Sequence, residues 1–318
     1  MAYSLAIAAL SLAVFAAYTS VRAREIEARI ARLYPPLGVL VPVQDGVVHA
    51  VQYGAGPDLV LLHGALTNLR DFPEPLVTAL AKDFRVTLMD RPGCGYSTRI
   101  ARIVDPRAQA VALSHAADVL GLQSPIVVGH SYGATVAAAW AQCGNALPVR
   151  PAALVLLSGP LMPAPVALAW LRRLAVSPGL RRIASLLGTA WIPSRAVRRV
   201  AAMAFAPEPL PRGYAKRAAA RLTLRRASIR ANARQMSALG SALGRLGAEL
   251  PQLALPVELL HGTADQVVPH ATHSVAAASL IPGAGLTLLE GRGHMLHHTA
   301  PQAVITAIRR AAALALPG

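Results

Sequence analysis

The chain has 318 residues, of which 54% are hydrophobic, and a formal net charge of +16. This length predicts one main domain of about 270 residues with an additional part. Two cysteines, Cys94 and Cys143, do not indicate a disulfide framework. The sequence has no Walker motif, no G-x-G-x-x-G after a strand and no cysteines at metal spacing, so it indicates no nucleotide or metal cofactor.

The N-terminal segment Ala2–Val21 is uncharged and rich in alanine and leucine, and arginines follow it at once. Twenty apolar residues are about the length that spans a bilayer. We favour a single uncleaved anchor in the inner membrane, and the arginines then place the rest of the chain in the cytoplasm. Two alternatives remain open. One is a signal peptide cleaved near Val14–Ala16, which gives a periplasmic or secreted protein. The other is an accessory helix packed on the protein.

Residues 22–36 read as a charged helical linker that Pro35 and Pro36 end. Leu37–Val43 and Val47–Tyr53 then predict an antiparallel hairpin.

Strands and helices alternate after this hairpin. Short apolar runs predict strands, and longer segments predict helices over Leu69–Lys82 and Ala108–Leu120. The predicted strands are Asp58–Leu62, Arg85–Met89, Ile126–Val128, Ala153–Ser158, Val257–Leu260 and Leu286–Leu289. We therefore expect an α/β fold with a mostly parallel sheet that is covered by helices on both faces.

The alternation stops in residues 161–250, which favour helix. They stand between the two parts of the predicted α/β core, 37–160 and 251–318. This segment has 16 arginines and lysines against Glu208 and Glu249, so it carries 14 of the 16 net positive charges. It can be a solvated helical face, a surface for an anionic membrane or a site for an anionic substrate. We expect no nucleic-acid partner, because no recognition motif accompanies the charge.

A G-x-S-x-G pentapeptide, Gly129 to Gly133, stands between an apolar run and a small-residue helical segment. Such a sharp strand-to-helix turn exposes a serine nucleophile, here Ser131, and the two glycines give strand and helix room to approach. The alternative is a glycine-rich turn whose serine caps the helix.

An activated serine also needs donors for an oxyanion. His63-Gly64-Ala65 follows the strand Asp58–Leu62, and Gly64 lets the backbone approach closely. The backbone N–H groups of Ala65 and Tyr132 are the predicted oxyanion hole, and His63 is predicted to fix this loop.

The acid and the base are expected after late strands. Asp265 follows Val257–Leu260 and is the predicted acid; its alternative role is to cap a helix near His270. A competing acid would lie after the preceding strand, but Gly159–Ala164 contains no carboxylate. His294 lies in a glycine-flanked loop after the last predicted strand. His297 and His298 are its rivals, and the three histidines also suggest a metal cluster. No cysteine or second ligand pair supports that cluster, so we expect no metal.

The order Ser131, Asp265, His294 resembles the serine, acid, histidine order of the α/β-hydrolase fold superfamily, from about Leu37 to the C-terminus. The turn from Asp90 to Ser97 is also similar, with Cys94 where that family usually has histidine. The resemblance implies that Asp90 organises a loop. It also implies that residues 161–250 form a helical lid or cap inserted after the sixth strand. Seven apolar residues are expected on its underside: Trp170, Leu171, Leu174, Trp191, Met203, Phe205 and Met236.

The implied function is that of an esterase-like or lipase-like serine hydrolase acting on a small or lipid-like hydrophobic ester. Carbon–carbon bond hydrolase, perhydrolase and lactonase activities of the same fold stay open, as does a non-catalytic, membrane-associated binding homologue. Epoxide hydrolases and haloalkane dehalogenases are disfavoured, because they use an aspartate where this chain has Ser131.

Overall fold

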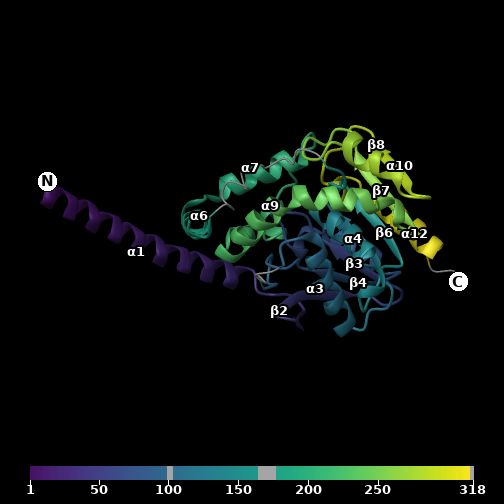
Figure 1. The fold of residues 1–318 in the computed structure, drawn as a ribbon, viewed down its shortest axis with the longest axis horizontal. Helices are drawn as coiled ribbons and strands as arrows, with labels where there is room; N and C mark the ends of the chain where they lie inside the picture. Colours follow the sequence, from purple (N-terminus) through teal and green to yellow (C-terminus); the bar gives the residue numbers. More distant parts are fainter. Residues whose placement is uncertain (99–102, 164–176, 316–318) are drawn as a thin grey trace.

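The described residues, 1–98, 103–163 and 177–315 of a computed structural model, contain one eight-stranded sheet. The strand order is β1-β2-β4-β3-β5-β6-β7-β8 (Figure 1). The strands are β1 Val39–Val43, β2 Gly46–Tyr53, β3 Asp58–Leu62, β4 Arg85–Met89, β5 Ile126–His130, β6 Ala153–Leu157, β7 Val257–Gly262 and β8 Gly285–Leu289.

The sheet is mostly parallel, as predicted. β1 and β2 form an antiparallel hairpin, β2 pairs antiparallel with β4, and the other neighbours pair in parallel. Parallel pairing brings the carboxyl ends of β3, β5, β7 and β8 to one edge, because Leu62 lies opposite Gly129 and Gly262 lies opposite Leu289. The loops that carry the predicted site residues all leave the sheet at this edge.

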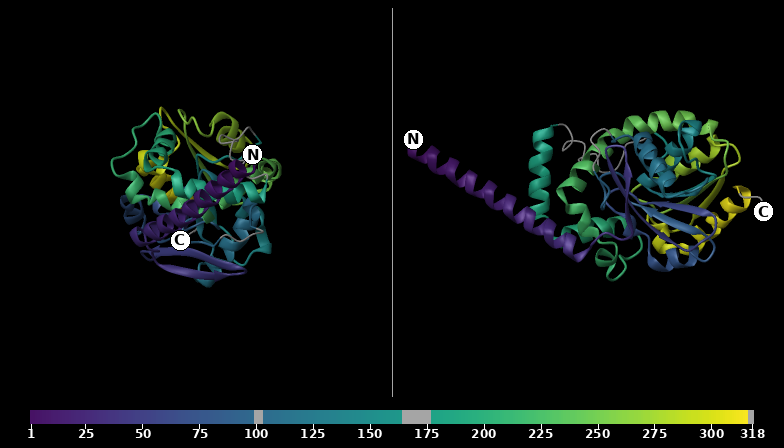
Figure 2. Two further views of the ribbon diagram at one scale, coloured as in Figure 1. Left: turned by 90° about the vertical axis from the view of Figure 1, so that its left-hand side faces the viewer. Right: turned by 90° about the horizontal axis from the view of Figure 1, so that it is seen from below.

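Helices cover both faces of the sheet (Figures 1 and 2). Alternate strand residues point to opposite faces, so Val60 and Leu62 join one apolar core and Leu59 and Leu61 join the other. The helices of the α/β part are α2 Glu74–Leu80, α3 Pro106–Val119, α4 Tyr132–Gln142, α10 Ala276–Leu280, α11 Leu296–Thr299 and α12 Pro301–Ala315. Short single turns are η1 Leu69–Asp71, η2 Gly144–Ala146, η4 Leu250–Gln252 and the wide turn η5 Ala271–Val275.

A helical insertion follows β6, as expected. It contains α6 Pro178–Trp191, α7 Ser194–Phe205, α8 Tyr214–Arg217, η3 Ala220–Leu224 and α9 Arg226–Glu249. Phe205 and Met236 are buried, as predicted for its underside. The same prediction is wrong for Trp191 and Met203, which are 43% and 68% exposed. Trp170, Leu171 and Leu174 lie outside the described residues.

The predicted anchor and the predicted linker form one continuous helix, α1 Ala2–Leu33. Its first half projects away from the body (Figures 1 and 2), and its length and apolar composition are enough to cross a membrane. Its second half packs on the insertion. Ala23 and Ile30 are buried there, and the Arg226 guanidinium lies 2.6 Å from the Glu27 carboxylate.

Candidate active site

Ser131 occupies the turn between β5 and α4 and has backbone angles of φ 53° and ψ −122°. A positive φ is unusual for a residue with a Cβ and costs about 1–3 kcal/mol. The Ser131 N–H donates to the carbonyl of Leu157 on β6 at 2.8 Å, which holds the turn against the neighbouring strand. Ser131 therefore has the strained position between strand and helix that the pentapeptide predicts, and its side chain does not cap the helix.

Glycine is required on both sides of this turn. A Cβ on Gly129 would lie 2.3 Å from the carbonyl oxygen of Gly133, and a Cβ on Gly133 would lie 2.3 Å from that of Leu62. Both distances are far shorter than van der Waals contact. The start of α4 thus packs directly against the end of β3, which brings Ser131 to the loop that follows β3.

The loop of Gly64 and Ala65 passes beside the Ser131 turn. A Cβ on Gly64 would lie 3.2 Å from the Cβ of Ser131. Tyr132 is the first residue of α4, and the first amides of a helix have no partner within it. The backbone positions of Ala65 and Tyr132 therefore flank Ser131. Their role as oxyanion donors stays a prediction.

Arg91 is fully buried and holds the same loop from behind. Its guanidinium donates to the carbonyls of His63 and Gly64 at 2.9 Å each, and also to Gln109 and to Gln235 of α9. Sequence reasoning missed this role, although Arg91 lies inside the turn that it did identify. Arg91 therefore links the carbonyls of this loop to Gln235 of α9, and so holds the loop to the insertion.

His63 is a structural residue, as predicted. Its Nε2 accepts from the backbone amide of Arg91 at 3.0 Å. Its Nδ1 therefore carries the proton and donates to the Gly64 carbonyl at 2.8 Å. Burial, reinforced by the positive charge of Arg91, lowers the pKa of His63 to about 4.

Asp90 organises a loop, also as predicted. Its carboxylate accepts from the amides of Leu69 and Tyr96 at 2.8 Å each and pairs with His49. Cys94 in the same turn is buried, and neither cysteine is in a disulfide.

Asp265 and His294 form a hydrogen-bonded pair. Oδ2 of Asp265 lies 2.7 Å from Nδ1 of His294, and both side chains are buried. Burial alone would raise the pKa of Asp265. His294 and the donors around the carboxylate, including the Val268 amide, outweigh burial and hold this pKa well below its usual range. An ionised carboxylate only accepts hydrogen bonds, so Nδ1 of His294 carries a proton, and in the neutral ring the lone pair is then on Nε2. That is the tautomer a general base requires.

His261 is a partner of Asp265 that sequence reasoning missed. Its Nε2 faces two acceptors, Oδ2 of Asp265 at 3.0 Å and the Val268 carbonyl at 2.9 Å, and must therefore carry the proton. Its Nδ1 lies 2.6 Å from the Ser274 hydroxyl, which donates to it. His261 thus orients the Asp265 carboxylate. His261 stands near the end of β7, four positions before Asp265, and this spacing is the sequence signal that could have indicated it.

His130 connects the Ser131 turn with the loop of His294. Its Nε2 donates to the His294 carbonyl at 3.0 Å, and the two rings lie 4.9 Å apart between centroids. The structure thus brings Ser131, His294 and Asp265 to one edge of the sheet. It shows no hydrogen bond between the Ser131 hydroxyl and the His294 ring, a contact that often tightens only when substrate binds. The triad assignment stays a prediction.

A second buried group lies beside this pair. We call Asp71, His130, His297, His298 and Tyr214 the Asp71 cluster. The carboxylate of Asp71 accepts from the Tyr214 hydroxyl at 2.6 Å and lies 3.4 Å from His297 Nε2 and 3.5 Å from His298 Nε2. The two histidines that rivalled His294 therefore face Asp71, not Asp265.

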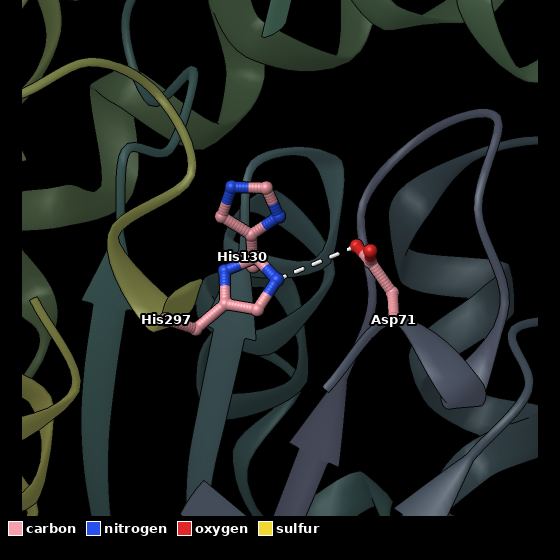
Figure 3. Close-up of side chains that lie close together, drawn as sticks. All are labelled: Asp71, His130 and His297. Atoms are coloured by element: carbon pink, nitrogen blue, oxygen red, sulfur yellow. Dashed lines mark ion pairs between the residues drawn. The ribbon is translucent and has the colours of Figure 1, made fainter. Parts of the chain in front are cut away.

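Figure 3 shows three members of the cluster, with one ring nitrogen of His130 and one of His297 turned toward Asp71. Their ligand atoms lie within 4.8 Å of one another, and all three residues are buried, so by spacing this group could hold a cation. It is a different group from the His294, His297 and His298 cluster considered in the sequence. The expectation of no metal stays a prediction.

Curated proteins include similar chains. An uncharacterized protein of Mycobacterium tuberculosis is 28% identical over 267 residues, which are 81% of this chain and 75% of that protein. A 2-hydroxy-6-oxononadienedioate/2-hydroxy-6-oxononatrienedioate hydrolase of Pseudomonas putida is 35% identical over 120 residues, 36% of this chain and 41% of that protein.

Solved structures share the fold. The epoxide hydrolase CorEH aligns with a TM-score of 0.70 and 21% identity over 86% of this chain and 97% of its own. An esterase from Thermogutta terrifontis aligns with a TM-score of 0.69 and 20% identity over 87% of this chain and 99% of its own. A bacterial membrane phospholipase A aligns with a TM-score of 0.67 and 20% identity over 97% of this chain and 99% of its own. The profile of the alpha/beta hydrolase family matches residues 59–307, and the chain therefore belongs to that family.

Proposed function

We propose that this protein is a membrane-anchored serine hydrolase that cleaves carboxylic esters of small or lipid-like hydrophobic substrates. The observation that carries the proposal is the strained turn at Ser131 at the same sheet edge as the buried Asp265–His294 pair. A turn that costs conformational energy persists where the surrounding structure enforces it, and such turns concentrate at active sites.

The proposed mechanism uses these residues in sequence. Nε2 of His294 takes the proton of the Ser131 hydroxyl as the oxygen attacks the ester carbonyl carbon. The amides of Ala65 and Tyr132 stabilise the oxyanion, and Asp265 stabilises the imidazolium. His294 then gives its proton to the leaving alcohol. A water molecule, deprotonated by His294, hydrolyses the acyl-enzyme in the second half of the reaction.

Carbon–carbon bond hydrolysis is the second candidate, and the similarity to the Pseudomonas putida hydrolase favours it. Perhydrolase, lactonase and a non-catalytic binding role are weaker alternatives. Epoxide hydrolysis stays disfavoured despite the shared fold with CorEH, because this chain has Ser131 and not aspartate at the nucleophile position.

We also propose that α1 remains attached as a membrane anchor, with the catalytic part in the cytoplasm. Two observations support an uncleaved helix. The Phe15 ring, which cleavage near Val14–Ala16 would remove, stacks on Trp191 of the insertion at 6.1 Å between centroids. The structural match to the membrane phospholipase A covers 97% of this chain, so it includes most of α1. Protease accessibility of the catalytic part in sealed inner-membrane vesicles distinguishes the cytoplasmic face from the periplasmic one.

The test of the catalytic proposal is labelling of the full-length protein in detergent with a fluorophosphonate. Mass spectrometry should find the adduct on Ser131, and His294→Ala should abolish it. Short-chain nitrophenyl esters should be hydrolysed by the parent protein and not by folded Ser131→Ala. Equal hydrolysis by the parent and by Ser131→Ala would remove the triad assignment.

A further inference from the structure

Helix α6 has two opposite faces. Ser185 and Thr189 are buried, and the Thr189 hydroxyl donates to the Leu224 carbonyl at 2.5 Å, so this face packs on the insertion. The opposite face exposes large apolar side chains at helical spacing: Leu180 57%, Ile183 56%, Leu187 38% and Trp191 43%. At 100° per residue these four positions form one stripe. A contiguous exposed apolar stripe of this kind marks an interaction surface.

The C-terminal end of α6 is fixed against α1 at a definite level. The Trp191 ring stacks with Phe15 at 6.1 Å and lies 6.0 Å from Tyr18. The Arg22 guanidinium lies 4.7 Å from the Trp191 ring, and its Nε donates to the Ala190 carbonyl at 2.9 Å. These contacts fall where the uncharged stretch Ala2–Val21 meets its first arginine. In an anchored protein that level is the boundary between acyl chains and headgroups, where tryptophan and tyrosine concentrate.

The direction of α6 fits the same boundary. Figure 2 shows α6 running across α1, on the side of the body from which the first half of α1 projects. When α1 lies along the bilayer normal, α6 therefore runs across this normal and not along it. Its buried face is turned to the body, so the apolar stripe is turned outward.

The charges around the stripe favour one occupant. α6 and α7 contain no acidic residue. Arg182 on α6 and Arg195, Arg198 and Arg199 on α7 are exposed. An apolar helical stripe on a segment that is basic and free of acidic residues is the pattern of a helix that lies in the surface of an anionic bilayer, each basic residue near that surface contributing about 1 kcal/mol.

We propose that α6 is an interfacial helix, with Leu180, Ile183, Leu187 and Trp191 inserted at the headgroup boundary of an anionic bilayer beside α1. The inference rests on the proposed anchoring through α1. Docking through α6 seats the helical insertion, and the carboxyl edge of the sheet below it, at the membrane surface. The stripe is continuous with the membrane-spanning part of α1, which a binding site for a soluble protein partner would not require.

The test is fluorescence of the full-length protein in phosphatidylcholine vesicles with and without phosphatidylglycerol. The Trp191 signal is the difference between the parent protein and Trp191→Phe. Lipids brominated near the glycerol end of the acyl chain should quench this signal more than lipids brominated near the methyl end, and phosphatidylglycerol should increase the quenching. Equal Trp191 fluorescence in brominated and ordinary lipid would overturn the proposal.

A variant pair tests the stripe itself. Ile183→Gln/Leu187→Gln should weaken docking of α6 by at least roughly tenfold, because each aliphatic side chain loses its transfer into the bilayer. The quenching of Trp191 should then be reduced, and not abolished, because its contacts with Phe15 and Tyr18 of α1 remain. The matched control is Val119→Gln on α3, which is 61% exposed and should leave quenching unchanged. Equal loss in both variants, or in neither, would contradict the assignment to this stripe.

Two further readouts separate this proposal from the proposed function. Flotation with vesicles tests anchoring by α1, and nitrophenyl ester hydrolysis in detergent tests catalysis. Protein that floats and hydrolyses ester, but whose Trp191 is not quenched, overturns the interfacial helix alone. Protein that does not float overturns the anchor and the interfacial helix with it. Protein that is quenched but inactive supports the interfacial helix and contradicts the catalytic proposal.

Discussion

Ser131→Gly should make the folded protein more stable while it removes the proposed nucleophile. Ser131 has a φ of 53°, a conformation that glycine adopts without steric cost. The strain at such a residue is about 1–3 kcal/mol. Glycine loses roughly 0.5–1 kcal/mol more backbone entropy on folding than alanine does. The net gain expected from the substitution is therefore about 1 kcal/mol, within a range of roughly 0–2.5 kcal/mol.

The control is Ser131→Ala, which also removes the hydroxyl but keeps a Cβ and therefore the strain. For a chain of this size, 1 kcal/mol shifts the melting temperature by about 2 °C. Ser131→Gly should thus melt about 2 °C, and at most about 5 °C, above Ser131→Ala when both are scanned at one rate in the same detergent. A glycine variant that melts at or below the alanine variant would refute the view that this turn stores strain.

His261→Ala should lower kcat at least roughly tenfold with little change in KM, because the Asp265 carboxylate loses a hydrogen bond that orients it; an unchanged kcat for the nitrophenyl ester would show that Asp265 does not need this partner. Stability should decrease as the pH falls from about 6.5 to about 4, because the pKa of His63 is lowered to about 4 and the unfolded chain binds the proton first. Urea unfolding across this range should give His63→Gln a slope smaller by up to about 1.4 kcal/mol per pH unit, and identical slopes would speak against a neutral His63. Gly133→Ala should prevent normal folding, since its Cβ would lie 2.3 Å from a carbonyl oxygen. Gly240→Ala on α9, where the Cβ meets nothing within 4 Å, should be neutral or stabilising by up to about 1 kcal/mol; similar expression and melting of these two variants would contradict the steric argument.

The strands were predictable because their signal is local. β3 and β4 have the predicted bounds, since short apolar runs buried on both faces need only their own sequence to be recognised. The helix predicted over Leu69–Lys82 is wrong in its first part. It divides into η1 and α2 because Pro73 stands before the first turn of α2 and cannot continue a helix from η1.

The site residues divide in the same way. Ser131 and His294 could be proposed because each stands in a short motif with glycines, and Asp265 because it follows a strand in a chain poor in acids. His261, Arg91 and Asp71 could not, because their roles depend on partners elsewhere in the fold. Gln235, for example, is 144 positions away from Arg91. The position of Trp191 also had no local signal. Its ring packs against Phe15 of α1, which is far away in the sequence, and not beneath the insertion.

The bonds from α9 to the loop after β3 limit how this fold can be recombined. The Leu66 amide, next to Ala65, donates to the Asn232 side chain at 3.0 Å, and Gln235 binds Arg91 at 2.9 Å. A chimera that receives the insertion of a relative without equivalents of Asn232 and Gln235 would keep its Ser131 turn and its Asp265–His294 pair. It would lose the support of the Ala65 amide. Exchange of substrate preference between members of this family should therefore transfer α9 together with the loop of residues 63–66, as one unit.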